Sequence, residues 1–208
     1  MSAPPERSPE RDAALLALLP QVGRFGWTYA ALRRGLREAG ADPADAELLF
    51  PGGTADLLEA WIDLEDRLMT AAVAERDTAG LRLPARVRLA IELRLAAARP
   101  HREAVRRAVT VLLLPRHAGL AARTLTRTVD AIWHAAGDRS ADFAWYTKRL
   151  ILGAIYTATL LFWLRDNATD DTATLAFLDR RLAGHARFHR AQQKCSKRLT
   201  RYLPGEAA

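Results

Sequence analysis

Residue types suited to catalysis or metal binding are present in this chain, but their spacing matches no catalytic motif. The five histidines lie at positions 101, 117, 134, 185 and 189. None forms an H-E-x-x-H motif or the Glu-x-x-His pair of di-iron bundles, and no Gly-rich phosphate loop or nucleophile elbow is present. Asp130 and His134 are four residues apart, which predicts a hydrogen-bonded surface pair, because a metal site needs more ligands. We therefore expect a binding protein that is not an enzyme and uses no cofactor or metal.

A short aromatic row is the clearest candidate for contact with a partner. The stretch D-F-A-W-Y-T-K-R occupies residues 142–149, and on a helix Trp145 has Asp142 at i−3 and Arg149 at i+4. A helical wheel places Trp145 nearly opposite a predicted core stripe of Phe143, Leu150, Ala154, Ala158 and Leu161. Tryptophan and arginine dominate protein interfaces, which favours an interface role for this row. The alternative is that Trp145 packs against another helix of the same chain.

The segment that follows this row, Leu150–Leu164, contains no charged residue. It is shorter than the roughly 20 residues that a membrane-spanning helix needs, so no transmembrane segment is predicted. A helix that is apolar on nearly every side either lies inside a large core or lines an apolar cavity, and the sequence leaves both open. Further apolar wall is available from Val109–Leu114, Ile132 and Trp133.

The positive charge of the chain is concentrated near its end. The formal net charge is +7, and the eight Lys/Arg residues between Arg180 and Leu203 have no acid among them. Their helical spacing beside apolar residues predicts an amphipathic helix at 181–203 that binds an anionic membrane surface. The predicted membrane-binding residues are Phe188, Arg190, Lys194, Lys197, Leu199 and Arg201. The alternative is a solvated helix packed on its own domain.

The elements that must position these residues are predicted to be helices only. No apolar/polar alternation or hairpin signal is found, while Ala, Leu and Arg dominate. Expected helices cover about Arg11–Leu19, Thr28–Ala39, Pro43–Leu49, Thr54–Arg76, Pro84–Ala98, His101–Leu114, Ala118–Ala136, Ala141–Arg165 and Thr172–Arg201, with Thr54 as an N-cap. We expect a disordered leader at 1–10 and a single helical domain at 11–180. The leader contains acids and prolines, which argues against a transit peptide and favours a bacterial cytoplasmic protein.

The first three predicted helices, within residues 11–50, resemble the start of tetracycline-repressor-type regulators. The segment L-F-P-G-G-T-A-D-L-L-E-A-W (Leu49–Trp61) carries the aromatic residue, the Gly-containing turn and the apolar spacing of that resemblance. DNA binding depends on Lys/Arg contacts with phosphates, yet no Lys or Arg occurs between Glu38 and Asp66. This charge pattern predicts a vestigial helix-turn-helix. Arg33, Arg34 and Arg37 keep the alternative of operator binding open.

Five motifs carry a broader resemblance. They are G-W-T-Y-A-A-L (Gly26–Leu32), L-F-P-G-G (Leu49–Gly53), D-A-I-W-H-A-A-G-D-R-S-A-D-F-A-W-Y-T-K-R (Asp130–Arg149), A-I-Y-T-A-T (Ala154–Thr159) and F-L-D-R-R (Phe177–Arg181). With these motifs the chain resembles the Coq-nine family of ubiquinone (coenzyme Q) biosynthesis lipid-binding proteins. The resemblance implies a tetracycline-repressor-like bundle of about nine or ten helices, a homodimer, and a C-terminal amphipathic helix that attaches to the membrane.

The resemblance also implies a function. Family members bind isoprenoid quinone intermediates and support the demethoxyubiquinone hydroxylase, and the family's hydroxylase-contact surface corresponds here to Asp142, Trp145, Tyr146 and Arg149. We expect a non-catalytic accessory protein on the inner face of the bacterial cytoplasmic membrane. From the helix faces, the predicted lipid-binding residues are Leu112, Trp133, Ile155, Thr159 and Phe162. The alternative is a ligand-responsive transcription regulator of the tetracycline-repressor type.

Overall fold

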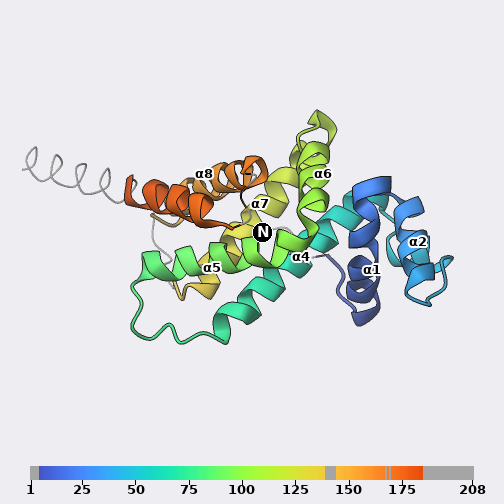
Figure 1. The fold of residues 1–208 in the computed structure, drawn as a ribbon, viewed down its shortest axis with the longest axis horizontal. Helices are drawn as coiled ribbons and strands as arrows, with labels where there is room; N and C mark the ends of the chain where they lie inside the picture. Colours follow the sequence, from blue (N-terminus) through green and yellow to red (C-terminus); the bar gives the residue numbers. More distant parts are fainter. Residues whose placement is uncertain (1–4, 139–143, 167, 169, 185–208) are drawn as a thin grey trace, which may run out of the picture. The chain divides into compact units, whose positions relative to one another are not determined.

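A computed structural model of the chain describes residues 5–138, 144–166, 168 and 170–184, and the side chains of all of these except 144–146. Within these residues every regular element is a helix (Figure 1), which confirms the all-α prediction. Contacts divide the chain into two compact units, Met1–Tyr156 and Thr157–Ala208. The single helical domain expected at 11–180 stays a prediction, and the boundary between the two units falls inside a helix.

Helices α1 (Pro9–Phe25), α2 (Tyr29–Glu38) and α3 (Asp45–Leu49) form the helix-turn-helix end of the first unit. Ser8 and Thr28 cap the first two helices, each by accepting a backbone N–H bond of 3.2 Å. The two helices lie side by side in Figure 1, and Gly35 permits this: a Cβ there would lie 2.2 Å from the Ala17 carbonyl oxygen. Glycine is therefore required where α2 crosses α1.

The first helix begins and ends at other residues than the sequence predicts. The leader was expected to reach residue 10, but α1 begins at Pro9 and Arg7 already binds Asp63. The first helix was expected to end at Leu19, yet it continues through Pro20 to Phe25. A proline inside a helix removes one backbone hydrogen bond, and the burial of Leu18 and Val22 on either side of it offsets that cost.

The body of the first unit is built on α4 (Gly53–Ala74), which contacts α1, α5 and α7. The other helices of the body are α5 (Leu83–Ala98), α6 (Arg102–Leu112) and α7 (Ala118–Ala135), with single 3₁₀ turns at Arg99–His101 and Pro115–His117. Thr54 is not the predicted N-cap of α4, because Gly52 occupies that position and the Thr54 hydroxyl donates to the Trp27 carbonyl at 2.8 Å.

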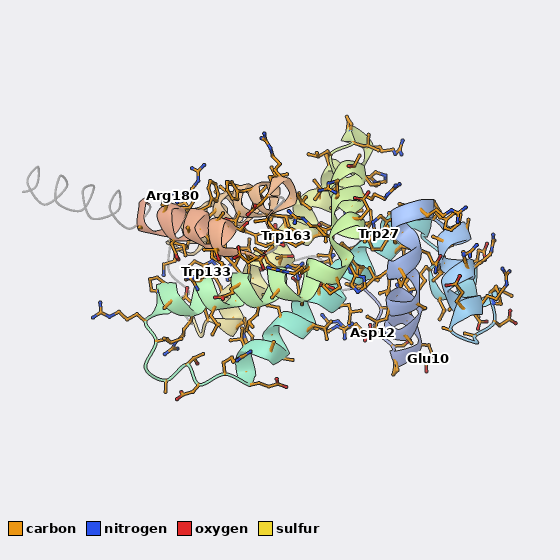
Figure 2. All side chains as sticks on the ribbon, in the orientation of Figure 1. Glu10, Asp12, Trp27, Trp133, Trp163 and Arg180 are labelled. Carbon is orange, nitrogen blue, oxygen red and sulfur yellow. The ribbon has the colours of Figure 1, made fainter. Side chains whose placement is uncertain are left out.

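Trp27 connects the helix-turn-helix end to the body. Its ring lies 4.8 Å from that of Trp61 on α4, and its indole N–H donates to the Ala104 carbonyl on α6 at 3.0 Å. Figure 2 labels Trp27 at this junction. Because a buried indole needs an acceptor, the bond fixes the first turn of α6 on the rest of the unit.

Helix α8 (Ala144–Arg165) buries a different face from the one predicted. Leu150 is 76% exposed and Leu161 is 42% exposed, although both belonged to the predicted core stripe. The buried side instead carries Leu152, Tyr156 and Thr159. The helix is apolar on several sides, so the wheel could not identify which of them packs. No helix among the described residues is long and apolar enough to cross a membrane.

The second unit contains the end of α8 and a further helical segment at 172–184. The rings of Phe162 and Phe177 stack with centroids 4.6 Å apart. The indole N–H of Trp163 donates to Asp171 at 3.0 Å, and the Thr174 hydroxyl donates to Asp166 at 3.1 Å. These contacts bring the start of the segment against the end of α8.

Candidate functional site

Helices α4 and α7 border a groove of about 1090 Å³ in the first unit. Alanines from both helices line it, and charged side chains line it as well. The charged lining residues are Arg7, Asp63, Asp66, Arg67, Arg123, Arg127, Asp130, Asp138 and Arg149, and His134 lies among them. The small alanine side chains leave room between the two helices, and the charged side chains determine which ligands the groove can bind.

At the α1 side of the groove, two arginines share two carboxylates. Arg67 binds Asp12 at 2.6 and 2.9 Å and Asp63 at 3.1 Å, and Arg7 binds Asp63 at 2.6 and 2.8 Å. The hydrogen bond to Asp63 raises the pKa of Arg7, and the hydrogen bond to Asp12 raises the pKa of Arg67. The network ties the start of α1 to the middle of α4, and Figure 2 labels Asp12 on α1.

At the α8 side of the groove, ion pairs fasten the start of α8 to the end of α7. Arg149 donates to the Asp130 carboxylate, and Lys148 lies 3.8 Å from the Asp138 carboxylate. Asp130 therefore binds Arg149 rather than the predicted partner, His134. On the opposite rim, the Glu59 carboxylate accepts from Arg123 at 3.3 Å and from Arg127.

The charges that line the groove are nearly balanced, with five arginines and four aspartates. Most of them pair with one another or with a neighbouring carboxylate. A balanced, paired rim does not favour a phosphate, which needs surplus positive charge.

Behind the groove lies a buried polar cluster that joins four helices. The Arg94 guanidinium on α5 lies 2.9 Å from the Asp66 carboxylate on α4 and donates to the Tyr156 hydroxyl on α8 at 2.9 Å. The Thr128 hydroxyl on α7 donates to Asp66 at 3.0 Å. The closest contact between Arg94 Nη1 and Asp66 Oδ1 is an ion pair that is not aligned as a hydrogen bond. We call these four residues the buried quartet.

Burial sets the electrostatics of the quartet. It raises the pKa of Asp66 to about 6, although Arg94 and Thr128 favour the carboxylate. Burial also raises the pKa of Glu65, the neighbour of Asp66, and Arg94 again opposes that shift. For Arg94, burial acts to lower the pKa, but Asp66 and Tyr156 raise it above its ordinary value. The Arg94 cation therefore stabilises the charged form of two buried carboxyl groups, those of Asp66 and Glu65.

No cluster of three or more His, Cys, Asp or Glu side chains suited to a metal ion occurs in the part of the chain that the structure describes. The groove and the quartet offer ion pairs and hydrogen bonds. Their chemistry is that of binding and of structural support.

Comparison with known proteins places this region in a family. Residues 118–189 match the COQ9 family model. The rat "Ubiquinone biosynthesis protein COQ9, mitochondrial" is 34% identical over 174 residues, which are 81% of this chain and 56% of the relative. The human protein of the same name is 33% identical over 174 residues, covering 81% and 55%. The chain carries a COQ9 domain. The predicted family is confirmed, and the chain spans about half the length of the curated relatives it matches.

Two solved structures resemble the fold. A TetR transcriptional regulator from Nitrosomonas europaea aligns with a TM-score of 0.68 and 24% identity over 86% of this chain and 99% of that protein. The fatty acid degradation regulator FadR from Bacillus halodurans aligns with a TM-score of 0.53 and 14% identity over 86% and 95%. At these identities the likeness concerns the fold alone, and it confirms the predicted tetracycline-repressor-like bundle.

The COQ9 domain contains the predicted partner-binding surface, of which the structure describes one side chain. Arg149 lies at the groove and binds Asp130. Asp142 and the side chains of Trp145 and Tyr146 lie outside the described set. An exposed Trp145 that contacts a partner stays a prediction.

The predicted lipid-binding residues fall into separate places. Leu112 is the last residue of α6. Trp133 lies near the end of α7, about 22 Å from the first residue of that helix, Ala118, at a rise of 1.5 Å per residue. Trp133 is half-buried, and its indole nitrogen is buried without a hydrogen-bond acceptor. Ile155 is buried in the first unit. Thr159, which is buried, and Phe162, which stacks on Phe177, belong to the second unit.

The six predicted membrane-binding residues, from Phe188 to Arg201, lie outside the described residues. The buried quartet was missed by the sequence analysis, although a signal for it existed. In α5 the buried positions Val87, Ala90, Ile91, Arg94, Leu95 and Ala98 form one stripe at helical spacing. An arginine on an apolar stripe needs a buried carboxylate, and Asp66 occupies the matching stripe of α4.

Proposed function

We propose that this protein is a non-catalytic accessory protein of ubiquinone biosynthesis, which binds quinone intermediates at a membrane and presents them to a hydroxylase. The observation that carries the proposal is the match of residues 118–189 to the COQ9 family, together with curated COQ9 relatives named as ubiquinone biosynthesis proteins. The matched segment contains α7 and α8 and includes the groove side chains from Ala122 to Arg149.

The proposed hydroxylase surface is supported by the construction of the start of α8. Arg149 and Lys148 bind carboxylates at the end of α7, so the first turns of α8 are held on the body of the unit. A docking surface gains affinity when its side chains are ordered before the partner arrives. The aromatic pair Trp145 and Tyr146 would then contact the demethoxyubiquinone hydroxylase, with Asp142 and Arg149 orienting it.

The proposed lipid site is supported by apolar side chains of α7 and α8. Trp133 presents a half-buried ring and an indole N–H without an acceptor, which a quinone carbonyl could accept from. Within the second unit, Phe162 is half-buried and stacks on Phe177. We propose that catalysis belongs to the hydroxylase, that the protein acts as a homodimer, and that it lies on the inner face of the bacterial cytoplasmic membrane through residues 181–203.

Lipid extraction tests the lipid site. The purified full chain should carry an isoprenoid quinone or a related intermediate that mass spectrometry detects in an organic extract. Trp133→Leu keeps an apolar side chain and removes the N–H donor to the quinone carbonyl, so it should lower the amount of quinone that is extracted with the protein. Ile132, which is fully buried on the same helix, provides the matched control as Ile132→Val. Isoprenoid-free extracts from folded, full-length protein would contradict the proposal.

A pull-down with the hydroxylase tests the partner surface. Trp145→Ala should weaken hydroxylase binding while the thermal melt remains cooperative and close to that of the wild type. Thr147→Ala, an exposed neighbour on the same turn, is the control. Loss of the cooperative melt in Trp145→Ala would identify Trp145 as a core residue and contradict the interface.

The second candidate is a ligand-responsive transcription regulator, which the tetracycline-repressor-like fold favours. The surface of α2 argues against it. Arg33 binds Glu47, and Arg34 binds Glu38 at 2.9 Å, so carboxylates already occupy two of the three arginines that would contact phosphates. A salt-sensitive gel shift with the promoter DNA of the protein's own gene would favour the regulator, and we expect none.

A further inference from the structure

The end of α6 exposes apolar side chains to an unusual degree. Leu113 is 75% exposed and Leu114 is 37% exposed, and they directly follow the last residue of α6, the half-buried Leu112. Val109 and Val111, in the last turn of the helix, are half-buried as well. We call residues 109–117 the α6–α7 tip. Adjacent exposed leucines on a turn mark a contact surface more often than scattered single ones do.

The tip extends beyond the part of α6 that is packed. The buried residues of α6 are Ala104, Val105 and Ala108, all in its first two turns, and the bond from Trp27 to Ala104 fixes the same end. Between Ala108 and Leu120 no residue is buried. Figure 1 shows the turn between α6 and α7 at the outer end of both helices, away from α4. The apolar side chains of the tip are therefore presented by a rigid support.

The surroundings of the tip are strongly cationic. Residues 99–127 contain seven arginines and one acid, Glu103. Arg106 and Arg107 share that acid, at 2.8 and 3.2 Å, so one carboxylate faces two guanidinium groups. Arg116, inside the tip, is exposed beside the leucines. Arg123 and Arg127, further along α7, pair with Glu59, so the positive charge beside the apolar end comes from Arg106, Arg107 and Arg116.

We infer that the α6–α7 tip inserts into an anionic lipid surface, as a second membrane contact in addition to residues 181–203. This inference rests on the proposed membrane function. Leucines can enter the boundary between head groups and acyl chains, while nearby arginines pair with lipid phosphates. The charge complementarity selects an anionic bilayer over a neutral one. The contact also places Leu112, a predicted lipid-binding residue, at the membrane surface.

A fluorescent label tests insertion directly. In the full chain with Cys195→Ser, Leu113→Cys is labelled with a nitrobenzoxadiazole fluorophore and mixed with vesicles of phosphatidylglycerol and phosphatidylcholine. The emission should rise and shift to shorter wavelength, and it should change much less with vesicles of phosphatidylcholine alone. The matched control is Leu48→Cys on α3, because Leu48 is 79% exposed and lies among acids. No response at position 113, or an equal response at both positions, would overturn the inference.

Variants that place a negative charge in the tip test how much the tip contributes to vesicle binding. The double variant Leu113→Glu with Leu114→Glu should lower partitioning into the anionic vesicles by about tenfold or more. Arg116→Glu should lower it by about fivefold. Leu48→Glu should leave it unchanged. All four side chains are exposed, so thermal melts should match the wild type. Unchanged partitioning of the tip variants would contradict the inference.

Lipid extraction separates this inference from the proposed function. If the label at position 113 in the full chain gives no vesicle response while the full-length protein still yields isoprenoid on extraction, the tip inference fails and the lipid-binding function stands. If no isoprenoid is extracted, the lipid-binding function fails whatever the label reports. Tip variants that lose hydroxylase binding or self-association but keep vesicle binding would identify a protein interface instead.

Discussion

Arg11 in the helix-turn-helix end and Arg94 in the α4–α7 body are both buried, yet their surroundings differ. Arg11 binds the Leu49 carbonyl, lies 2.6 Å from the Asp56 carboxylate, and has its guanidinium 4.4 Å from the centre of the Phe50 ring. Asp56 is partly exposed to solvent. Arg94 instead faces Asp66, Glu65 and Tyr156, all of which are buried.

The difference teaches what each arginine does. Arg11 joins three helices at the edge of the fold, where water still reaches its counter-ion, so its loss leaves no buried charge behind. Arg94 neutralises carboxyl groups that have no access to water, so its loss leaves them uncompensated. Both are structural, but only the second couples the body of the protein to pH.

The largest expected effect is the loss of Arg94. Arg94→Ala should lower the free energy of unfolding by about 3–5 kcal/mol, because Asp66 and Glu65 remain buried without a cation. Urea unfolding at pH 7.5 measures it. The double variant Arg94→Met with Asp66→Leu removes both charges and should recover most of the loss. A loss below about 1 kcal/mol for Arg94→Ala would refute the role of the quartet and the comparison built on it.

The quartet also marks a limit of sequence analysis. Caps and apolar stripes were sufficient to predict nearly all the helices, since each is a local signal. Arg94 and Asp66 lie 28 positions apart on different helices, and their pairing depends on how α4 and α5 pack. The sequence shows that no Lys or Arg lies between Glu38 and Asp66, but it does not reveal that Asp63, Glu65 and Asp66 are buried.

The sequence predicted the wrong buried face of α8 for a related reason. Leu150 and Leu152 are equally apolar, and only the neighbouring helices decide that the second is buried. The structure places Arg149 at the groove, and its predicted role in partner binding stays a prediction. The groove between α4 and α7 has no signature in the sequence, because its lining comes from segments up to 142 positions apart, from Arg7 to Arg149.

The second effect, pH dependence, follows from Asp66. Its pKa is about 6 in the folded protein and 3.8 ordinarily, so the folded chain binds this proton more tightly than the unfolded chain does. Stability should therefore fall as pH rises from about 4 to 6, by up to about 3 kcal/mol, and stay level above that range. Glu65 acts in the same direction. Urea unfolding from pH 4 to 7.5 measures the slope.

The control for this slope is Asp66→Asn. His101 acts in the opposite direction, because burial lowers its pKa and the folded protein loses stability as that side chain becomes charged. The difference between the wild type and Asp66→Asn cancels this contribution and isolates Asp66. Parallel pH profiles for the two proteins would mean that Asp66 titrates normally and that the body of the protein is not coupled to pH.

A smaller effect is expected for Arg11. Arg11→Ala removes a charged hydrogen bond to Asp56, a bond to the Leu49 carbonyl and the contact with the Phe50 ring. The expected loss is about 2 kcal/mol, independent of pH between 5 and 8, since the carboxylate left behind is hydrated. Thermal unfolding measures it, with Asp56→Asn as the milder control. A loss as large as that of Arg94→Ala would erase the distinction between the two arginines.

The smallest effect is expected at Arg33, a half-exposed residue of α2 that binds the half-exposed Glu47 on α3. Surface ion pairs contribute little, so Arg33→Ala should change the free energy of unfolding by less than about 1 kcal/mol. If α2 and α3 contacted DNA, the same variant would weaken binding to a DNA fragment, and Glu47→Ala would strengthen it by releasing the arginine. We expect neither change in a gel shift at low salt. A DNA affinity that rises in Glu47→Ala and falls in Arg33→Ala would show that α2 still serves phosphates, and the helix-turn-helix end would then be more than a structural support.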